Sequence, residues 1–394
     1  MSAAAAPGFG LKPLLFANMA CTMAMMAFVA VVGPVSRALG LMPWQAGLSV
    51  TVSGGLWMLL ARVWGAASDR RGRRPVLLFG VGGVFVAYLL MCLAIDGALR
   101  TLPGMLWSFL ALVLTRGAVG GFYAAIPAVS QALIADHVPP QRRAAALAAL
   151  GSAGAVGLVL GPAVAAALAR FSLSAPLYGM LLLPLLAWLV LWRRLPREAP
   201  RAAAGQPAIR LADPRLRRPM AVAFVAMFGV GIAQITVGFF ALDRLGLPAA
   251  EAARVAGIAL TLVGVALVLS QLLVRRLPLG PARMIRIGGL VAAGGFGAAL
   301  WVDSQISLWV CYFVSAAGMG WIFPAFSALA ANAVQPHEQG TTAGSIGAAQ
   351  GLGMVCGPFI GSLLYGVGPA VPYLLVAVLL MLMALWPAAR QSPD

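Results

Sequence analysis

The chain has 394 residues, of which 62% are hydrophobic and 9% are charged. Soluble domains carry roughly 25% charged residues, so this chain cannot cover a water-exposed surface with ionised groups. The formal net charge is +17, but the arginines lie in short gaps between long apolar runs. This arrangement argues against nucleic-acid binding, which needs a basic stripe on a water-facing element, and indicates membrane topology with anionic lipids as partners.

Twelve apolar segments are long enough to span a bilayer as helices, which takes roughly 20 residues each. The first six lie at 14–39, 46–68, 76–95, 105–135, 141–170 and 174–195. A linker rich in arginine and proline follows at 196–217. The last six lie at 218–241, 250–274, 283–301, 306–334, 338–366 and 369–390. The sequence therefore predicts an all-α membrane protein with two six-helix halves, 1–195 and 218–394.

Arginine and lysine are distributed unequally between the two sides of the predicted membrane. One side holds 20 of them and the other holds 5. By the positive-inside rule the rich side is cytoplasmic, which places both termini in the cytoplasm. We therefore expect a multi-pass protein of the inner (plasma) membrane, with anionic lipids at its cytoplasmic face.

The two predicted halves repeat each other. A shift of 196 residues brings the fourth and fifth spans onto the tenth and eleventh, and it superimposes Gly157, Gly161 and Pro162 on Gly353, Gly357 and Pro358. A six-plus-six repeat is typical of one large class of secondary transporters, in which the substrate site lies near the midplane between the halves. Glycines four residues apart let helix backbones approach closely, and a proline permits a bend. We predict that these six residues pack and pivot the central helices, with plain packing as the alternative.

A charged motif joins the second and third spans. It reads Gly65-Ala66-Ala67-Ser68-Asp69-Arg70-Arg71-Gly72-Arg73-Arg74-Pro75. Asp69 lies at the carboxyl end of the second span, where the helix dipole disfavours an anion, so this carboxylate needs another partner. The eleventh span begins near Glu338 on the same side, and its free amides offer a positive helix terminus.

We predict a cytoplasmic gate in which Asp69 docks on that helix terminus and locks the halves together. The arginines of the motif are expected to pair with Asp69 or with the carboxylate at the end of the fourth span. The predicted gate residues are Asp69, Arg70, Arg73, Arg74 and Asp136. The alternative is that the arginines only anchor the topology.

The motif resembles the cytoplasmic signature of the major facilitator superfamily, because its Gly, Asp, Arg, Gly, Arg, Arg order is intact. Other features are similar to the twelve-span drug:proton antiporter branch of that superfamily: Arg116 with Gly120 and Gly121, the fifth-span glycines that end at Gly161-Pro162, and Gly33-Pro34. One departure is Ala165-Ala166, where that branch usually has glycines. The resemblance covers the whole chain and implies proton-driven export by alternating access.

Two arginines fall within predicted spans. An arginine at the centre of the hydrocarbon layer costs at least ~2.5–3.5 kcal/mol, so it usually faces a cavity and functions there. Arg116 lies deep and is expected to bind substrate. Arg62 lies near the inner end of its span and either lines the cavity or extends to the interface.

No acidic residue lies in the middle third of a span, whereas antiporters for cationic drugs commonly carry an embedded carboxylate. Asp243, at the outer end of the seventh span, is the nearest candidate for proton coupling, and Asp96 is the next. Further polar and aromatic residues are expected to line a substrate cavity, although each alone is more often a packing residue. They are Asn18, Tyr123, Gln234, Phe239, Trp321 and Gln350.

These features predict a monomeric secondary transporter that exports small amphipathic organic molecules, driven by protons. Neutral, zwitterionic or anionic substrates are favoured over simple cations. The alternatives are a dedicated exporter of a siderophore or another metabolite, and an importer of an organic anion. An enzyme is not expected, since catalytic clusters of histidines or carboxylates are missing, and neither are a metal or a cofactor. A channel is not expected either, because it would need a ring of repeated filter groups, which a two-fold repeat with a single Arg116 does not provide.

The topology has a direct test. A reporter that is active only in the periplasm is fused to Asp394, and we expect no signal because the 20-to-5 distribution places this end in the cytoplasm. The same reporter in the loop after the first span, which is predicted to be periplasmic, serves as the positive control. A strong signal from the Asp394 fusion would overturn the topology.

Overall fold

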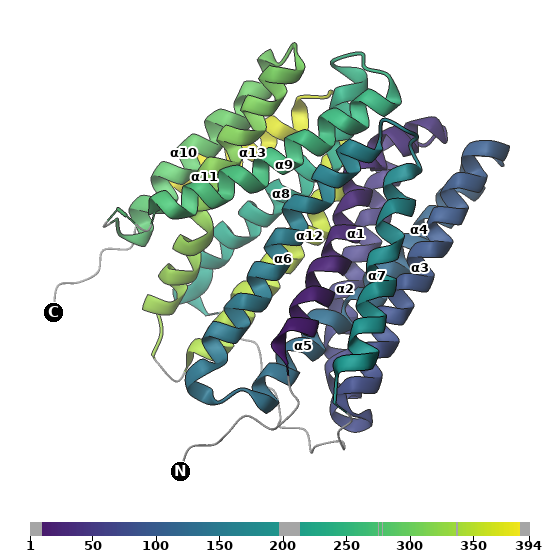
Figure 1. Ribbon diagram of the computed structural model, residues 1–394. Helices are drawn as coiled ribbons and strands as arrows, with labels where there is room; N and C mark the ends of the chain where they lie inside the picture. The colour runs from purple at the N-terminus through teal and green to yellow at the C-terminus, as the bar shows by residue number, and fades with distance from the viewer. Residues whose placement is uncertain (1–9, 197–212, 275, 278, 336–337, 387–394) are drawn as a thin grey trace. The chain divides into compact units, whose positions relative to one another are not determined.

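The computed structural model describes residues 10–196, 213–274, 276–277, 279–335 and 338–386, and these are almost entirely helical (Figure 1). Up to residue 196 the helices are α1 (Leu11–Ala38), α2 (Pro43–Arg71), α3 (Arg73–Thr101), α4 (Met105–Tyr123), α5 (Ala125–His137), α6 (Pro140–Leu168) and α7 (Ala175–Arg194). From residue 213 they are η1 (Pro214–Leu216), α8 (Arg217–Asp243), α9 (Ala249–Val274), α10 (Pro281–Gly297), η2 (Ala298–Trp301), α11 (Gln305–Asn332), α12 (Gln339–Tyr365) and α13 (Val371–Leu385).

The helices account for the twelve predicted spans. Within the described ranges, eleven helical segments are long and apolar enough to cross a membrane, and α13 is a shorter apolar helix of 15 residues. The segments α4 and α5 form one of these spans, Met105–His137. The prediction of an all-α, multi-pass membrane protein is therefore confirmed.

Two predicted boundaries differ from the structure for local reasons. Helix α3 continues to Thr101 rather than ending at 95, because Asp96 and Arg100, one helical turn apart, form an ion pair of 2.9 Å. The helical structure resumes at Pro214 rather than at 218, because the side chain of Asp213 accepts a hydrogen bond of 2.9 Å from the backbone N–H of Arg215. Residues 197–212 of the predicted linker lie outside the described residues.

The chain divides into two compact units. The first unit comprises residues 1–205 and 237–261, and the second comprises residues 206–236 and 262–394. The end of α8 and the beginning of α9 thus group with α1 to α7. Within the first unit, α1 packs along both α6 and α7, and α3 packs against α4 and α7 (Figure 1).

A single residue connects α2 to α3. Gly72 ends one helix and begins the next with a φ of +93°. This left-handed region strains any residue that carries a Cβ, so glycine is required at this turn. The tight connection holds the charged ends of α2 and α3 side by side.

The repeated glycines lie where two helices approach each other backbone to backbone. A Cβ added to Gly157 of α6 would lie 2.7 Å from the carbonyl oxygen of Met19 on α1, and one added to Gly161 would lie 2.6 Å from that of Met23. In the second unit, a Cβ on Gly357 of α12 would lie 2.6 Å from the carbonyl oxygen of Phe228 on α8. Gly353 meets Phe224 in the same way, and Pro358 packs against Gly231.

The close contact between α6 and α1 predicts opposite effects for two substitutions on the same helix. Gly157→Ala should destabilise the protein by about 1–3 kcal/mol because the methyl group overpacks the contact. Gly151→Ala is the matched control, since nothing lies within 4 Å of a Cβ built there, and alanine favours the helix by about 0.5–1 kcal/mol. Thermal unfolding of the purified variants measures both, and equal melting temperatures would contradict this account of the contact.

Candidate functional site

Arg73 is the centre of a charged cluster at the arginine-rich end of the first unit. It forms an ion pair with Asp69 of α2, and its Nε donates to Asp136 Oδ2 of α5 at 2.9 Å. Its Nη1 also donates to Ser68 Oγ at 2.7 Å. Asp69 lies at the carboxyl end of α2 and Arg73 in the first turn of α3, so each charge interacts unfavourably with the dipole of its own helix. The ion pair between them offsets both of these unfavourable interactions.

The structure thus brings together three of the five predicted gate residues. Arg74 is directed to α7 instead, where its Nη2 donates to the carbonyl oxygen of Trp192 at 2.7 Å. Arg70 is exposed. Docking of Asp69 on the start of α12 stays a prediction.

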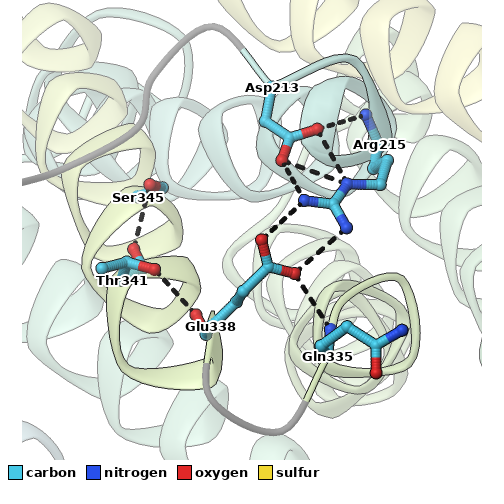
Figure 2. Close-up of polar contacts among 6 residues, drawn as sticks. All are labelled: Asp213, Arg215, Gln335, Glu338, Thr341 and Ser345. Atoms are coloured by element: carbon cyan, nitrogen blue, oxygen red, sulfur yellow. Dashed lines mark hydrogen bonds and ion pairs between the residues drawn. The ribbon is translucent and has the colours of Figure 1, made fainter.

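The amino end of α12 has its own carboxylate within the second unit. Figure 2 shows Arg215 between Asp213 and Glu338. The Arg215 Nη2 atom lies 2.8 Å from Asp213 Oδ2 and 3.0 Å from Glu338 Oε1, and Glu338 also accepts from the backbone N–H of Gln335 at 3.1 Å. Sequence reasoning missed this cluster, whose signal is an Asp-x-Arg before one helix and a glutamate before another.

A chain of hydrogen bonds joins α1, α4 and α6. Asn18 Nδ2 donates to the carbonyl oxygen of Leu150 at 2.9 Å, and Thr22 Oγ1 lies 2.7 Å from the carbonyl oxygen of Asn18 and 2.8 Å from the hydroxyl of Tyr123. The Tyr123 ring also contacts Trp57 of α2 at a centroid distance of 6.4 Å. Asn18 and Tyr123, two of the predicted cavity residues, are therefore connected through the hydroxyl of Thr22.

Arg116 is buried in the first unit, with 2% of its surface exposed. Its guanidinium lies over the ring of Phe28 on α1, 4.7 Å from the centroid, which is a cation–π geometry. The Nε and Nη1 atoms are buried without a hydrogen-bond partner. The position follows from the packing of α4 against α2, where Gly120 lies directly against Ser53.

The repeat-related position in the second unit is occupied by a tyrosine whose hydrogen bonds are satisfied. The Tyr312 hydroxyl donates to the carbonyl oxygen of Ala233 at 2.8 Å and lies 2.8 Å from the Tyr373 hydroxyl. Thr236 Oγ1 lies 2.9 Å from Tyr373. Tyr373 and Thr236 were not singled out from the sequence, because a buried tyrosine on an apolar helix looks like a packing residue.

The remaining predicted substrate residues are divided between the two units. Gln234, Trp321 and Gln350 belong to the second unit and are partly exposed. Arg62 of α2 is exposed. Phe239 is fully buried, with the guanidinium of Arg37 5.8 Å from the centre of its ring.

Asp243, the predicted proton-coupling residue, forms an ion pair with Arg37. The Arg37 Nη2 atom lies 2.8 Å and 2.6 Å from the two carboxylate oxygens. Nearby, a Cβ added to Gly33 of α1 would lie 2.8 Å from the backbone of Gly238, so the ends of α1 and α8 touch backbone to backbone. Sequence reasoning did not pair Arg37 with Asp243, although each residue ends the first helix of its predicted half.

The motif, the repeated glycines and the helical fold all agree with a known family. A family model described as Major Facilitator Superfamily matches residues 14–344 and 254–393. The chain belongs to this superfamily. The resemblance drawn from Asp69 and its flanking residues is thereby confirmed.

Relatives within the superfamily include resistance proteins. The tetracycline resistance protein, class C, of Escherichia coli is 28% identical over 335 residues, which cover 78% of this chain and 76% of the relative. The multidrug resistance protein MdtG of Serratia proteamaculans is 39% identical over 106 residues. That match covers 27% of this chain and 23% of the relative.

Solved structures share the superfamily fold over nearly the whole chain. A bacterial homologue of the human lysosomal transporter Spinster, in an inward-facing and occupied conformation, aligns with a TM-score of 0.74 at 16% identity, covering 95% of this chain and 94% of that one. The human organic anion transporter MFSD10 aligns with a TM-score of 0.64 at 20% identity, covering 95% and 97%. At these identities the likeness establishes the fold.

The cluster around Arg73 allows a comparison of two variants that each remove one of its ion pairs. Asp136→Asn and Asp69→Asn should each lower stability by only ~0.2–1 kcal/mol, because these pairs are partly exposed. If Asp69 also docks on α12, Asp69→Asn alone should open the arginine-rich side. A contribution of about 1 kcal/mol shifts a balanced two-state population about fivefold.

The measurement is the rate of thiol labelling at Ser152→Cys, an exposed position on α6, in a chain from which the four native cysteines have been removed. We expect faster labelling in Asp69→Asn than in Asp136→Asn. Equal labelling in both variants, with normal transport, would reduce Asp69 to a topology anchor.

Proposed function

We propose that this chain is a secondary transporter that exports small amphipathic organic molecules, driven by protons, through alternating access. The observation that carries the proposal is the relative named for tetracycline resistance, which matches 78% of the chain from within the same superfamily. The shorter match to a multidrug resistance protein supports it. The protein acts as a monomer in the inner membrane, with both termini in the cytoplasm and anionic lipids at that face.

Two six-helix halves, 1–195 and 218–394, joined by the linker 196–217, are proposed to alternate around a central site. The Asp69–Arg73–Asp136 cluster acts as the cytoplasmic gate, together with Arg70 and Arg74. The close contacts at Gly157 and Gly161, and at their repeat partners, let α6 move together with α1, and α12 together with α8, each pair as a rigid body. Support comes from the backbone contacts of α6 with α1 and of α12 with α8.

The substrate class is argued from Arg116. A guanidinium cannot usefully lose its proton, since its reference pKa is above ~12, so the charge needs a counter-charge or a set of acceptors. The contact made in the described structure is the face of Phe28, and two nitrogen atoms keep unused donors. A neutral, zwitterionic or anionic substrate with a carboxylate or similar acceptor would satisfy those donors.

Proton coupling is assigned to Asp243. Its carboxylate holds Arg37 of α1 through both oxygens, so neutralising it would release that arginine and loosen the contact between the ends of α1 and α8. Such a release would allow opening at the side opposite the gate, as one half rocks against the other during alternating access.

Two other functions compete with this proposal. An importer of an organic anion fits the unused donors of Arg116 equally well. A dedicated exporter of a siderophore or another metabolite fits the same fold. Direction and substrate range distinguish the three functions.

The deciding experiment is a transport assay in inverted membrane vesicles with an imposed pH gradient. The panel contains anionic, zwitterionic, neutral and cationic compounds of similar size. Accumulation that depends on an acidic lumen supports proton-driven export, since the lumen of an inverted vesicle corresponds to the cell exterior. Movement only out of the vesicles, or no effect of the gradient, would reject the proposal.

Arg116 provides the sharpest test of the substrate class. Arg116→Ala should abolish transport of anionic substrates and spare neutral ones, whereas Arg116→Lys, which keeps the charge but loses the planar five-donor fork, should weaken carboxylate binding only partly. The matched control is Arg170→Ala, since Arg170 also lies 4.7 Å from the centre of an aromatic ring, that of Phe171, but is exposed. If transport of all substrates falls equally and in proportion to the folded yield, Arg116 stabilises the fold and does not bind substrate.

A further inference from the structure

A long apolar groove runs along the first unit, away from the clusters described above. It has a volume of about 920 Å³ and is lined by α3, α4 and α7. Its walls are exposed: 62% of Phe79 on α3 and 70% of Leu114 on α4 are accessible. The only polar side chains among its lining residues are those of Thr115 and Trp188, and the Thr115 hydroxyl donates to the carbonyl oxygen of Ala111 at 2.7 Å.

The groove follows one face of α3. Seven lining positions on this helix have the three- or four-residue spacing of one helical stripe, and Phe85 and Ala87 flank it. The seven are Pro75, Leu78, Phe79, Gly82, Gly83, Val86 and Leu90. At 1.5 Å per residue this stripe is about 22 Å long. It exceeds half of a hydrocarbon layer of about 30 Å, so an extended acyl chain of one leaflet can lie along it.

Two adjacent glycines lie at the middle of the lining stripe on α3. Gly82 and Gly83 lie on the stripe, where neighbouring positions carry large side chains. The ring of Phe122 lies directly against Gly83, and a Cβ on Gly82 would lie 3.2 Å from Nε1 of Trp188. The rings of Phe122 and Trp188 therefore lie close against α3 at the two glycines and form part of the apolar lining.

One end of the groove is strongly basic. Arg74 precedes the lining residue Pro75, and its Nη2 donates to the carbonyl oxygen of Trp192 at 2.7 Å. Its Nε atom has no hydrogen-bond partner. The next two residues of α7 are Arg193 and Arg194, both exposed.

Trp192 stacks on the lining residue Trp188 with a centroid distance of 6.2 Å. Tryptophans are enriched at the level of the lipid headgroups. This end of the groove therefore has both the aromatic and the basic character of a membrane interface.

We infer that the groove binds one anionic phospholipid, with an acyl chain along α3 beside the rings of Phe122 and Trp188 and its phosphate at Arg74, Arg193 and Arg194. The three arginines favour a lipid with an anionic headgroup, and the length of the apolar groove matches an extended acyl chain. The bound lipid fastens the arginine-rich ends of α3 and α7 to each other. Arg74 is a residue of the proposed gate, so lipid binding biases Arg74 toward α7.

The test uses the purified full-length chain, stripped of lipid and titrated with phosphatidylglycerol or phosphatidylcholine carrying identical chains. Bound lipids are counted by native mass spectrometry. Basic residues at a membrane surface attract anionic lipid by an amount that corresponds to about a fivefold change in affinity each. We expect at least fivefold tighter binding of phosphatidylglycerol to the wild type, and loss of that preference in Arg193→Gln/Arg194→Gln. The control pair is Arg283→Gln/Arg286→Gln, two exposed arginines on α10.

A second variant tests the groove itself. Ala118→Phe adds a ring at a partly exposed lining position of α4 and should lower the affinity for both lipids at this site. Val378→Phe, at an exposed apolar position on α13, is its control. Unchanged phosphatidylglycerol binding in Ala118→Phe, or equal losses in the two arginine pairs, would overturn the inference, and neither result depends on whether the chain exports drugs.

Discussion

The bilayer offers no hydrogen bonds, so every polar group inside it must find a partner within the protein. This constraint explains why the described chain is built from helices, whose backbone groups are satisfied internally. It also explains the serine and threonine hydroxyls that bond to carbonyl oxygens one turn earlier, as Thr115 and Thr236 do. Against this background Arg116 is exceptional, because a permanent charge keeps two unused donors in a buried position. Intramembrane arginines usually face a cavity and function there, and this is the role that we propose for Arg116.

Close backbone contact is the second organising feature. In each unit a glycine-bearing helix lies against another helix at distances that exclude any side chain. Such contacts place rigid rods side by side with few interlocking groups, and they occur where α6 meets α1 and where α12 meets α8. The polar chain from Asn18 to Tyr123 runs across the same packed region. The hydrogen-bonded chain and the close backbone contacts of Gly157 and Gly161 thus involve the same two helices, α1 and α6.

The fold could be predicted from the sequence because hydrophobic length, arginine distribution and repeated glycines are local signals. The charged cluster around Arg73, which we propose as the gate, was partly predictable, since Asp69 at the carboxyl end of a helix needed a positive partner. The arginine with which Asp69 pairs depends on the turn at Gly72, and only the structure gives the geometry of that turn. The ion pair of Arg37 with Asp243 joins residues 206 positions apart. The hydrophobic periodicity of the sequence does not predict such a long-range pair. Buried networks such as Tyr312 with Tyr373 are hidden for the same reason, since an aromatic residue on an apolar helix has the same pattern whether or not its hydroxyl is bonded.

The one-residue connection at Gly72 has a consequence for biogenesis. Helices α2 and α3 have 29 residues each and are separated by a single glycine with positive φ, so neither can leave the translocation machinery far ahead of the other. The two helices must enter the bilayer as a hairpin, with Arg70, Arg71, Arg73 and Arg74 held at its tip. Four charges at a tip are expensive to carry across the hydrocarbon layer, so the hairpin can be inserted in only one direction. We therefore expect the turn that brings Asp69 to Arg73 to set the orientation of this part of the chain early in synthesis.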